Sequence, residues 1–162
     1  MVPRVINPVP YQGGIFVLPG CHRPVKGYPD EAKEEGDLNV RALRGATTAK
    51  GNSRLEILEA ARELVLEVIS RNSVKPEDLA CIIFSSTPDL DAAFPAAAAR
   101  EAGLNTVPLF GAQEVGVEGS PEKCIRLLAL FNTEKTQADL RHVYLRGAAV
   151  LRPDLQDGGE TK

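Results

Sequence analysis

VPLFGAQEVGVEGSPEKCIR, residues 107–126, is the stretch on which the interpretation of the fold depends. Its apolar start is followed by a lone carboxylate, Glu114, between apolar neighbours. Ser120 and Pro121 then form a helix-start signal, because a serine hydroxyl can cap a helix and proline needs no N–H donor at the first helical position. We therefore expect a helix from Pro121 to about Phe131.

Arg126 stands apart from the apolar side of this expected helix. The apolar residues recur at helical spacing and form one stripe: Cys124, Leu127, Leu128 and Phe131. Arg126 lies roughly 150° from the centre of that stripe at 100° per residue. It is therefore either a solvated surface arginine, the common case, or a side chain that points into a cleft or toward another subunit.

The composition limits the classes of protein. A chain of 162 residues, 43% of them hydrophobic, is long enough for one core and suggests one domain. A net charge of −3 gives no electrostatic case for binding nucleic acid or an anionic membrane surface. No apolar segment approaches the length of a membrane helix, and no signal peptide is evident, so we expect a cytoplasmic protein.

Cysteine and histidine offer little material for metal or nucleophile chemistry. Cys21, Cys81 and Cys124 form no close pair, and we expect Cys81 and Cys124 to be small buried hydrophobic residues. His22 and His142 are the only histidines and lie far apart in the sequence. We therefore expect neither a metal site nor another cofactor.

Three regions follow from the distribution of proline and glycine. Residues 1–38 hold many of both without periodicity, so we expect them to be disordered or a non-native N-terminal extension. Lys33-Glu-Glu-Gly36 suggests a purine-rich ribosome-binding site, and we hypothesise that Leu38 occupies an alternative start. Residues 39–154 form the expected folded domain, and residues 155–162 a flexible tail.

The first half of the expected domain alternates strands with helices. Asn39–Arg44 has the alternation of a half-buried strand, with Val40, Ala42 and Gly45 facing one way, and 45–48 forms a small-residue turn. Ser53 and Glu56 make a capping box before a helix that ends near Arg71. Its apolar face consists of Leu58, Ala61, Leu64, Val65, Val68 and Ile69.

The second half continues this alternation. Residues 79–84 are apolar on both faces, as in an interior strand, and end in the polar loop 85–89. Such a loop at the carboxyl end of a strand is a common place for ligands. We expect an alanine-rich helix over 96–102, a helical turn over 136–140, and strands over 141–145 and 148–151. This order predicts a mixed α+β (α/β) domain.

Eight short fragments follow one another along the expected domain: Arg44-Gly-Ala-Thr-Thr48, Ser86-Thr-Pro-Asp-Leu90, Phe94-Pro-Ala96 with Arg100, Val107-Pro, Gln113-Glu114, Lys123-Cys-Ile-Arg126, Arg141-His-Val-Tyr144 and Val150-Leu-Arg-Pro-Asp154. In this order they resemble the monofunctional AroH-class chorismate mutases. The resemblance implies a homotrimer, with a pseudo-α/β-barrel built from the sheets of three subunits and active sites between neighbours. It also implies the conversion of chorismate to prephenate, an isomerase reaction of phenylalanine and tyrosine biosynthesis.

The resemblance also assigns roles to residues. Arg126 would contact the ether oxygen and a carboxylate, Arg44 would hold a carboxylate, Glu114 would accept a hydrogen bond from the ring hydroxyl, and Tyr144 would position a carboxylate. The implied substrate-binding residues are Phe94 and Ala96 in the wall supplied by the neighbouring subunit, Arg100 near the mouth, and Leu109, Phe110, Gly111, Leu151 and Arg152. A Claisen rearrangement needs no nucleophile, metal or proton transfer, which suits this set.

The sequence departs from the family pattern in its N-terminal extension, which has no counterpart there, and at two places within the expected domain. Ala97 stands where many relatives have a lysine, so one outer cation is missing. Phe110-Gly-Ala112 stands where the best-known pattern has Thr-Cys-Met, so no thiol is present at Gly111. We expect both changes to alter substrate affinity and to leave the type of reaction unchanged.

Two other functions fit the same arginines. A trimeric regulatory module could hold a small anionic metabolite without converting it, and a trimeric scaffold could leave the arginines solvated. A pure anion sensor would gain nothing from Glu114 beside a dianion, so this residue favours catalysis.

Overall fold

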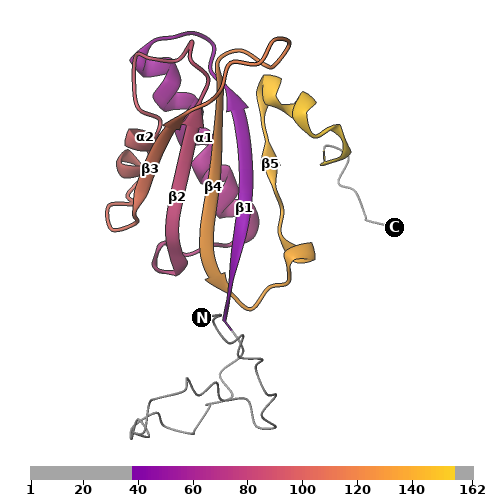
Figure 1. Ribbon diagram of the computed structural model, residues 1–162. Coiled ribbons are helices and arrows are strands. Elements are labelled where there is room, and N and C mark those ends of the chain that lie inside the picture. Colours follow the sequence, from indigo (N-terminus) through magenta and orange to yellow (C-terminus); the bar gives the residue numbers. More distant parts are fainter. Residues whose placement is uncertain (1–37, 156–162) are drawn as a thin grey trace, which may run out of the picture. The chain divides into compact units, whose positions relative to one another are not determined.

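The computed structural model describes residues 38–155, which fold as one mixed sheet with helices on one face (Figure 1). The strands are β1 (Asn39–Thr48), β2 (Leu79–Ser86), β3 (Leu109–Gln113), β4 (Cys124–Thr133) and β5 (Val143–Tyr144), in the order β3-β2-β4-β1-β5. The α-helices are α1 (Arg54–Asn72) and α2 (Ala96–Glu101). Short 3-10 helices are η1 (Pro76–Asp78), η2 (Gln137–Asp139), η3 (Arg146–Leu151) and η4 (Pro153–Leu155). The prediction of a mixed α+β fold is confirmed.

Helix α1 forms where its capping box predicts. The Ser53 hydroxyl accepts a hydrogen bond from the Glu56 N–H at 3.3 Å and donates one to the Glu56 carboxylate at 2.6 Å. Ser73 ends the helix in the left-handed conformation, with φ of 54°. Five of the six predicted core residues of this helix are buried, and Ile69 is half-buried. The helix therefore covers one face of the sheet through the stripe that the sequence indicated.

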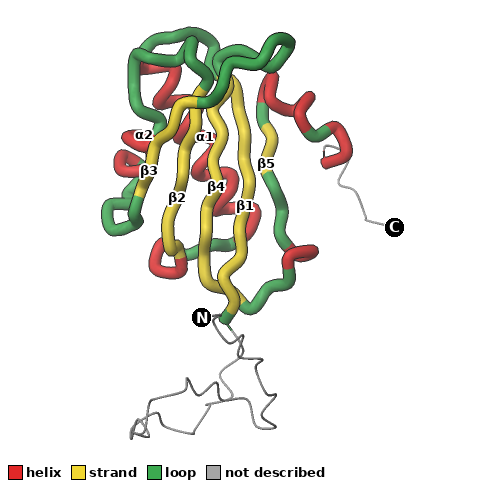
Figure 2. Tube along the Cα trace, viewed as in Figure 1, coloured by secondary structure: helices red, strands yellow, loops and turns green. Residues whose placement is uncertain are grey.

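The predicted helix over 121–131 is wrong, because this segment contains strand β4. Strand β4 lies between β1 and β2, as the tube view shows (Figure 2), and it is antiparallel to both. Ile125, Leu127, Ala129 and Phe131 alternate into the core. A continuous apolar run fits a helical and an extended period equally well, and here the two flanking strands decide in favour of the strand.

The turn before β4 replaces the predicted helix cap. The Ser120 hydroxyl donates a hydrogen bond to the Val117 carbonyl and caps no helix. Lys123 has φ of 51°, a left-handed conformation that would interrupt a right-handed helix at its first turn.

Strand β1 is longer than predicted, and Gly45 faces the side of the sheet opposite to the predicted one. The expected turn over 45–48 is wrong, since the strand continues to Thr48. Gly45 lies on the α1 side with Leu43, and not with Val40 and Ala42: a Cβ added to it would lie 3.1 Å from both Leu64 Cδ1 and Val68 Cγ2. The absence of a side chain at Gly45 lets α1 approach the sheet closely.

Other predictions hold in part. Residues 79–84 belong to an interior strand, but helices cover only one of its faces in this chain. The alanine-rich helix and the turn at 137–139 are present. The predicted strand over 141–145 narrows to Val143–Tyr144. The predicted strand over 148–151 is wrong, because these residues belong to the 3-10 helix η3, in which the Ala148 N–H donates to the Leu145 carbonyl. The expectations for residues 1–37 and 156–162 concern parts of the chain outside the described residues.

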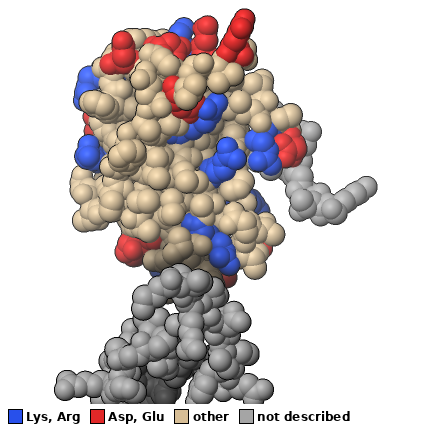
Figure 3. Space-filling view, viewed as in Figure 1, with Lys and Arg blue, Asp and Glu red and all other residues tan. Residues whose placement is uncertain are grey.

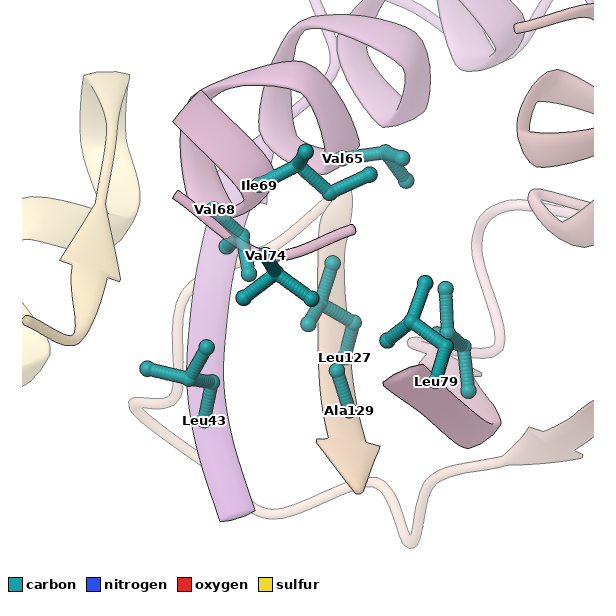
Figure 4. A pocket seen from close by; sticks show the side chains of 9 residues that line it. Leu43, Val65, Val68, Ile69, Val74, Leu79, Leu127 and Ala129 are labelled. Carbon is teal, nitrogen blue, oxygen red and sulfur yellow. The ribbon is translucent and has the colours of Figure 1, made fainter. Parts of the chain in front are cut away.

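The apolar core between α1 and the sheet contains a gap of about 10 Å³ with an entirely apolar lining (Figure 4). The lining residues are Leu43, Val65, Val68, Ile69, Val74, Leu79, Ile82, Leu127 and Ala129. This gap is a packing defect of the core and offers no polar group to a ligand.

No helix in the described range is both long enough and apolar enough to span a bilayer.

Candidate active site

One line of residues crosses the face of the sheet that α1 and α2 leave uncovered. We call it the helix-free face, although Ala148 of the 3-10 helix η3 packs on it against Ala46 and Cys124. The strand register places Ala112 of β3 beside Ser85 of β2, Ser85 beside Arg126 of β4, Arg126 beside Ala46 of β1, and Ala46 beside Tyr144 of β5. Arg126 thus faces away from the core, as the sequence indicated, but the alternation of a strand and not a helical angle puts it there.

A hollow of about 170 Å³ lies where the small side chain of Ala46 separates Arg126 from Tyr144. Its lining consists of Arg44, Gly45, Ala46, Arg126, Leu127, Tyr144, Leu151 and Arg152. Basic side chains gather over the middle of this face in the space-filling view (Figure 3). With three guanidinium groups, one phenol and no carboxylate in its lining, the hollow suits a small anion with more than one negative charge.

Glu114 lies on the other side of Arg126 and is held at both carboxylate oxygens. Arg126 Nη1 donates to Glu114 Oε2 in an ion pair, and Ser85 Oγ donates to Glu114 Oε1 at 2.6 Å. The Glu114 side chain is 13% exposed and that of Arg126 is 32% exposed. A second cavity, of about 480 Å³, opens beyond this pair toward the loop that precedes β4. The ion pair therefore separates two hollows.

Hydrogen bonds to His142 and Asp154 hold Arg44 and Arg152 at the first hollow. The Arg44 N–H donates to His142 Nδ1 at 3.1 Å. Arg152 donates to both oxygens of Asp154, with the shorter contact at 2.7 Å. The hydrogen bond to Asp154, with a smaller effect of Tyr144, raises the pKa of Arg152 above its ordinary value.

Residues 40–155 match the family described as chorismate mutase type I. The chain belongs to the type I chorismate mutase family. Chorismate mutase AroH of Thermus thermophilus is 49% identical over 118 residues, 72% of this chain and 97% of that protein. Chorismate mutase AroH of Bacillus subtilis (strain 168) is 44% identical over 119 residues, 73% of this chain and 94% of that protein.

A solved structure agrees with this assignment. A chorismate mutase from Clostridium thermocellum superposes with a TM-score of 0.67 and 45% identity. The match covers 68% of this chain and 98% of the other. The fold and the family assignment therefore rest on nearly the whole length of each relative.

The type I chorismate mutase residues assigned by resemblance fall into two groups. Arg44, Arg126, Tyr144, Leu151 and Arg152 line the first hollow, and Glu114 borders the second. The remaining assigned residues line neither hollow: Phe94, Ala96, Arg100, Leu109, Phe110 and Gly111. All of these lie in or beside α2 and β3, and β3 is the strand at the edge of the sheet opposite β5.

The assigned residues in or beside α2 and β3 differ from one another in their exposure to solvent. Phe94 is 82% exposed and Phe110 is 64% exposed, which leaves both aromatic rings without cover in this chain. Arg100 is also exposed, whereas Ala96 is only 8% exposed and has little surface to offer a ligand. At Gly111 an added Cβ would meet nothing within 4 Å, so the missing side chain leaves open space there.

Two contacts of the candidate site do not follow from the sequence. The sequence places Ser85 only as the first residue of the polar loop over 85–89, whereas its hydroxyl holds Glu114. Asp89 of the same loop accepts a hydrogen bond from the Lys123 N–H at 2.7 Å, where β4 begins. The polar composition after an interior strand was the available signal, but it could not indicate which hydroxyl or carboxylate meets which strand.

The cysteine predictions agree in part with the structure. Cys124 is fully buried on the same face of β4 as Arg126, and Cys81 is half-buried. Burial raises the pKa of the Cys124 thiol, despite the nearby Arg126 guanidinium. Among residues 38–155, no three histidine, cysteine or acidic side chains gather as a metal site would require.

Proposed function

We propose that this chain catalyses the rearrangement of chorismate to prephenate, the reaction of its family, in the biosynthesis of phenylalanine and tyrosine. The observation that carries the proposal is the position of Arg126, which borders the arginine-lined hollow on one side and Glu114 on the other. A hydroxyl-bearing dianion with an ether oxygen needs cationic donors and one carboxylate acceptor, and these groups are adjacent here.

The proposed mechanism is electrostatic and conformational. Arg44 and Tyr144 bind carboxylates and favour the folded, chair-like conformer, which lowers the entropic part of the barrier. Arg126 donates to the ether oxygen, where negative charge grows as the C–O bond breaks. Since that interaction is stronger in the transition state than in the ground state, it raises turnover and not only binding. Glu114 accepts a hydrogen bond from the ring hydroxyl.

We further propose that a homotrimer completes the site. Arg44 and Tyr144 lie at the β1–β5 edge of the sheet, whereas Phe94, Arg100 and Phe110 lie with α2 and β3 at the other edge. A heterologous contact, repeated around a three-fold axis, brings opposite edges of neighbouring subunits together. The exposed Phe94 and Phe110 and the half-exposed apolar residues Ile83 and Leu128 on the helix-free face support such a contact.

A mixing experiment tests the shared site. Chains with Arg126→Ala and chains with Phe94→Ala and Arg100→Ala are each expected to be impaired. After joint unfolding and reassembly in equal amounts, about a quarter of the interfaces would combine two intact halves, so activity would rise toward that fraction. No gain on mixing would place the whole site within one chain, and light scattering of the unmixed protein would report the trimer directly.

The activity itself is tested by the loss of the ultraviolet absorbance of chorismate. Turnover that disappears in Arg126→Ala supports the proposed enzyme. Binding of chorismate without turnover would favour a regulatory anion-binding module, which the same arginines would also allow. Neither binding nor turnover would leave a scaffold with solvated arginines.

A further inference from the structure

Ser85 contacts Glu114, and this contact indicates a further role in the site. Its hydroxyl is part-buried and donates to Glu114 Oε1 at 2.6 Å, while Arg126 donates to the other oxygen, Oε2. The Glu114 carboxylate is thus held by two side chains from two neighbouring strands, one neutral and one cationic. A short hydrogen bond from a hydroxyl to a carboxylate is among the stronger ones in proteins.

The sheet register fixes this three-residue arrangement. Ser85 and Arg126 are direct partners in the antiparallel pair of β2 and β4. Glu114 directly follows β3, and its N–H donates to the Ser86 carbonyl at 2.9 Å, which ties the chain to β2. Groups on regular strands are held more precisely than groups on loops. Ser85 therefore supplies a fixed donor to the carboxylate of Glu114, which lies one residue beyond the end of β3.

Removing this donor would change the pairing of Arg126. An arginine fork can take both oxygens of one carboxylate in a bidentate pair. With Oε1 oriented toward the Ser85 hydroxyl, the described pair uses Nη1 and Oε2. Without that hydroxyl, Glu114 can turn both oxygens toward Arg126 and draw the guanidinium away from the hollow beside Ala46.

We propose that Ser85 is a positioning residue of the active site. It holds Glu114 in one orientation and limits the hold of Glu114 on Arg126, so that the guanidinium keeps donors free for the substrate. The inference rests on the proposed chorismate mutase function and adds to it a residue that acts through Glu114.

The test compares three single variants of the full chain. Ser85→Ala is expected to lower kcat about tenfold, with a much smaller change in KM, because the lost hydrogen bond orients groups that act in the transition state. Ser85→Thr keeps a hydroxyl and should restore most of the turnover. Ser86→Ala removes a hydroxyl from the opposite face of the same strand and should leave kcat near that of the wild type.

A double variant separates positioning from a general structural effect. If Ser85 acts through Glu114, then adding Ser85→Ala to Glu114→Ala causes no further loss of kcat. Fully additive losses, or a Ser85→Ala chain as active as the wild type, would overturn the inference while leaving the proposed function intact. The same holds for a loss that Ser85→Thr does not restore. A wild-type chain without any turnover would instead overturn the proposed function, and this inference with it.

Discussion

The backbone N–H of Arg44 donates a hydrogen bond to Nδ1 of His142, at 3.1 Å, where β1 runs beside the start of β5. Burial, and then the positive charges of Arg152 and Arg44, lower the pKa of His142 below its ordinary value of 6.5. The neutral imidazole can accept the Arg44 hydrogen bond, whereas a protonated one has no acceptor left on either nitrogen. The hydrogen bond that holds the backbone of Arg44, a proposed substrate-binding residue, therefore depends on the protonation state of His142 and hence on pH.

The stability of the fold should fall as the pH decreases below 6.5. In the window between the lowered pKa of His142 and 6.5, the unfolded chain binds a proton that the folded chain does not. The free energy of unfolding consequently rises with pH in that window and levels off above it. Asp89, Asp139 and Asp154 also have lowered pKa values, but from 3.8, so their effect begins at lower pH.

Chemical denaturation at a series of pH values measures this dependence. His142→Gln keeps an acceptor oxygen and removes the titrating group, so its curve should be flatter between pH 5 and 7 than that of the wild type. Parallel curves for the two proteins would mean that His142 does not contribute to the pH dependence.

Arg126→Lys should remove most of the activity and little of the stability. Arg126 lies on the helix-free face of β4, so its replacement opens no gap in the core. Lysine keeps the charge but loses the planar fork, and loss of one such donor costs roughly 10²–10³-fold in kcat. Chorismate turnover and the melting temperature are the two measurements. A large drop in melting temperature would make Arg126 a structural residue.

Glu114→Ala should reduce turnover strongly with a modest loss of stability. The change removes the proposed acceptor for the ring hydroxyl and leaves Arg126 without its ion-pair partner. Since Arg126 is 32% exposed, water can solvate the guanidinium, and we expect a loss of about 1 kcal/mol in the free energy of unfolding. Kinetics close to those of the wild type would exclude Glu114 from the site.

Local signals predicted the helices and the general class of this fold. The capping box at Ser53 and the apolar stripe of α1 are read from residues near one another in the sequence, and both are present. The site residues were predictable only through resemblance to a family, because no short-range pattern relates Arg44 to Arg126. Their proximity depends on the pairing of β1 with β4, which joins positions about 80 residues apart.

The helix prediction for residues 121–131 is wrong for a related reason. Its apolar residues satisfy a helical stripe, yet the central position in a sheet requires only that most of them be apolar. The choice between the two is made by β1 and β2, which supply backbone partners on both sides. Likewise, the small residues after Arg44 suggest a turn, whereas in the structure Gly45 is small where α1 lies against the sheet and Ala46 is small where the hollow opens on the other face.

The two glycines Gly45 and Gly111 allow this close packing of α1 to be tested. At Gly45 an added Cβ would lie 3.1 Å from Leu64 Cδ1 and Val68 Cγ2 and 3.3 Å from Leu127 Cγ, all within the core. Gly45→Ala should therefore lower the free energy of unfolding by about 1–3 kcal/mol, the usual cost of overpacking.

Gly111→Ala is the matched control, since an added Cβ there meets nothing within 4 Å. Its stability should equal or exceed that of the wild type by about 0.4–1 kcal/mol, because alanine restricts the unfolded chain more than glycine does. Denaturant unfolding of both variants gives the comparison. Equal stabilities for the two variants would mean that α1 can move away from β1 at little cost, and that Gly45 is not what sets the distance between the helix and the sheet.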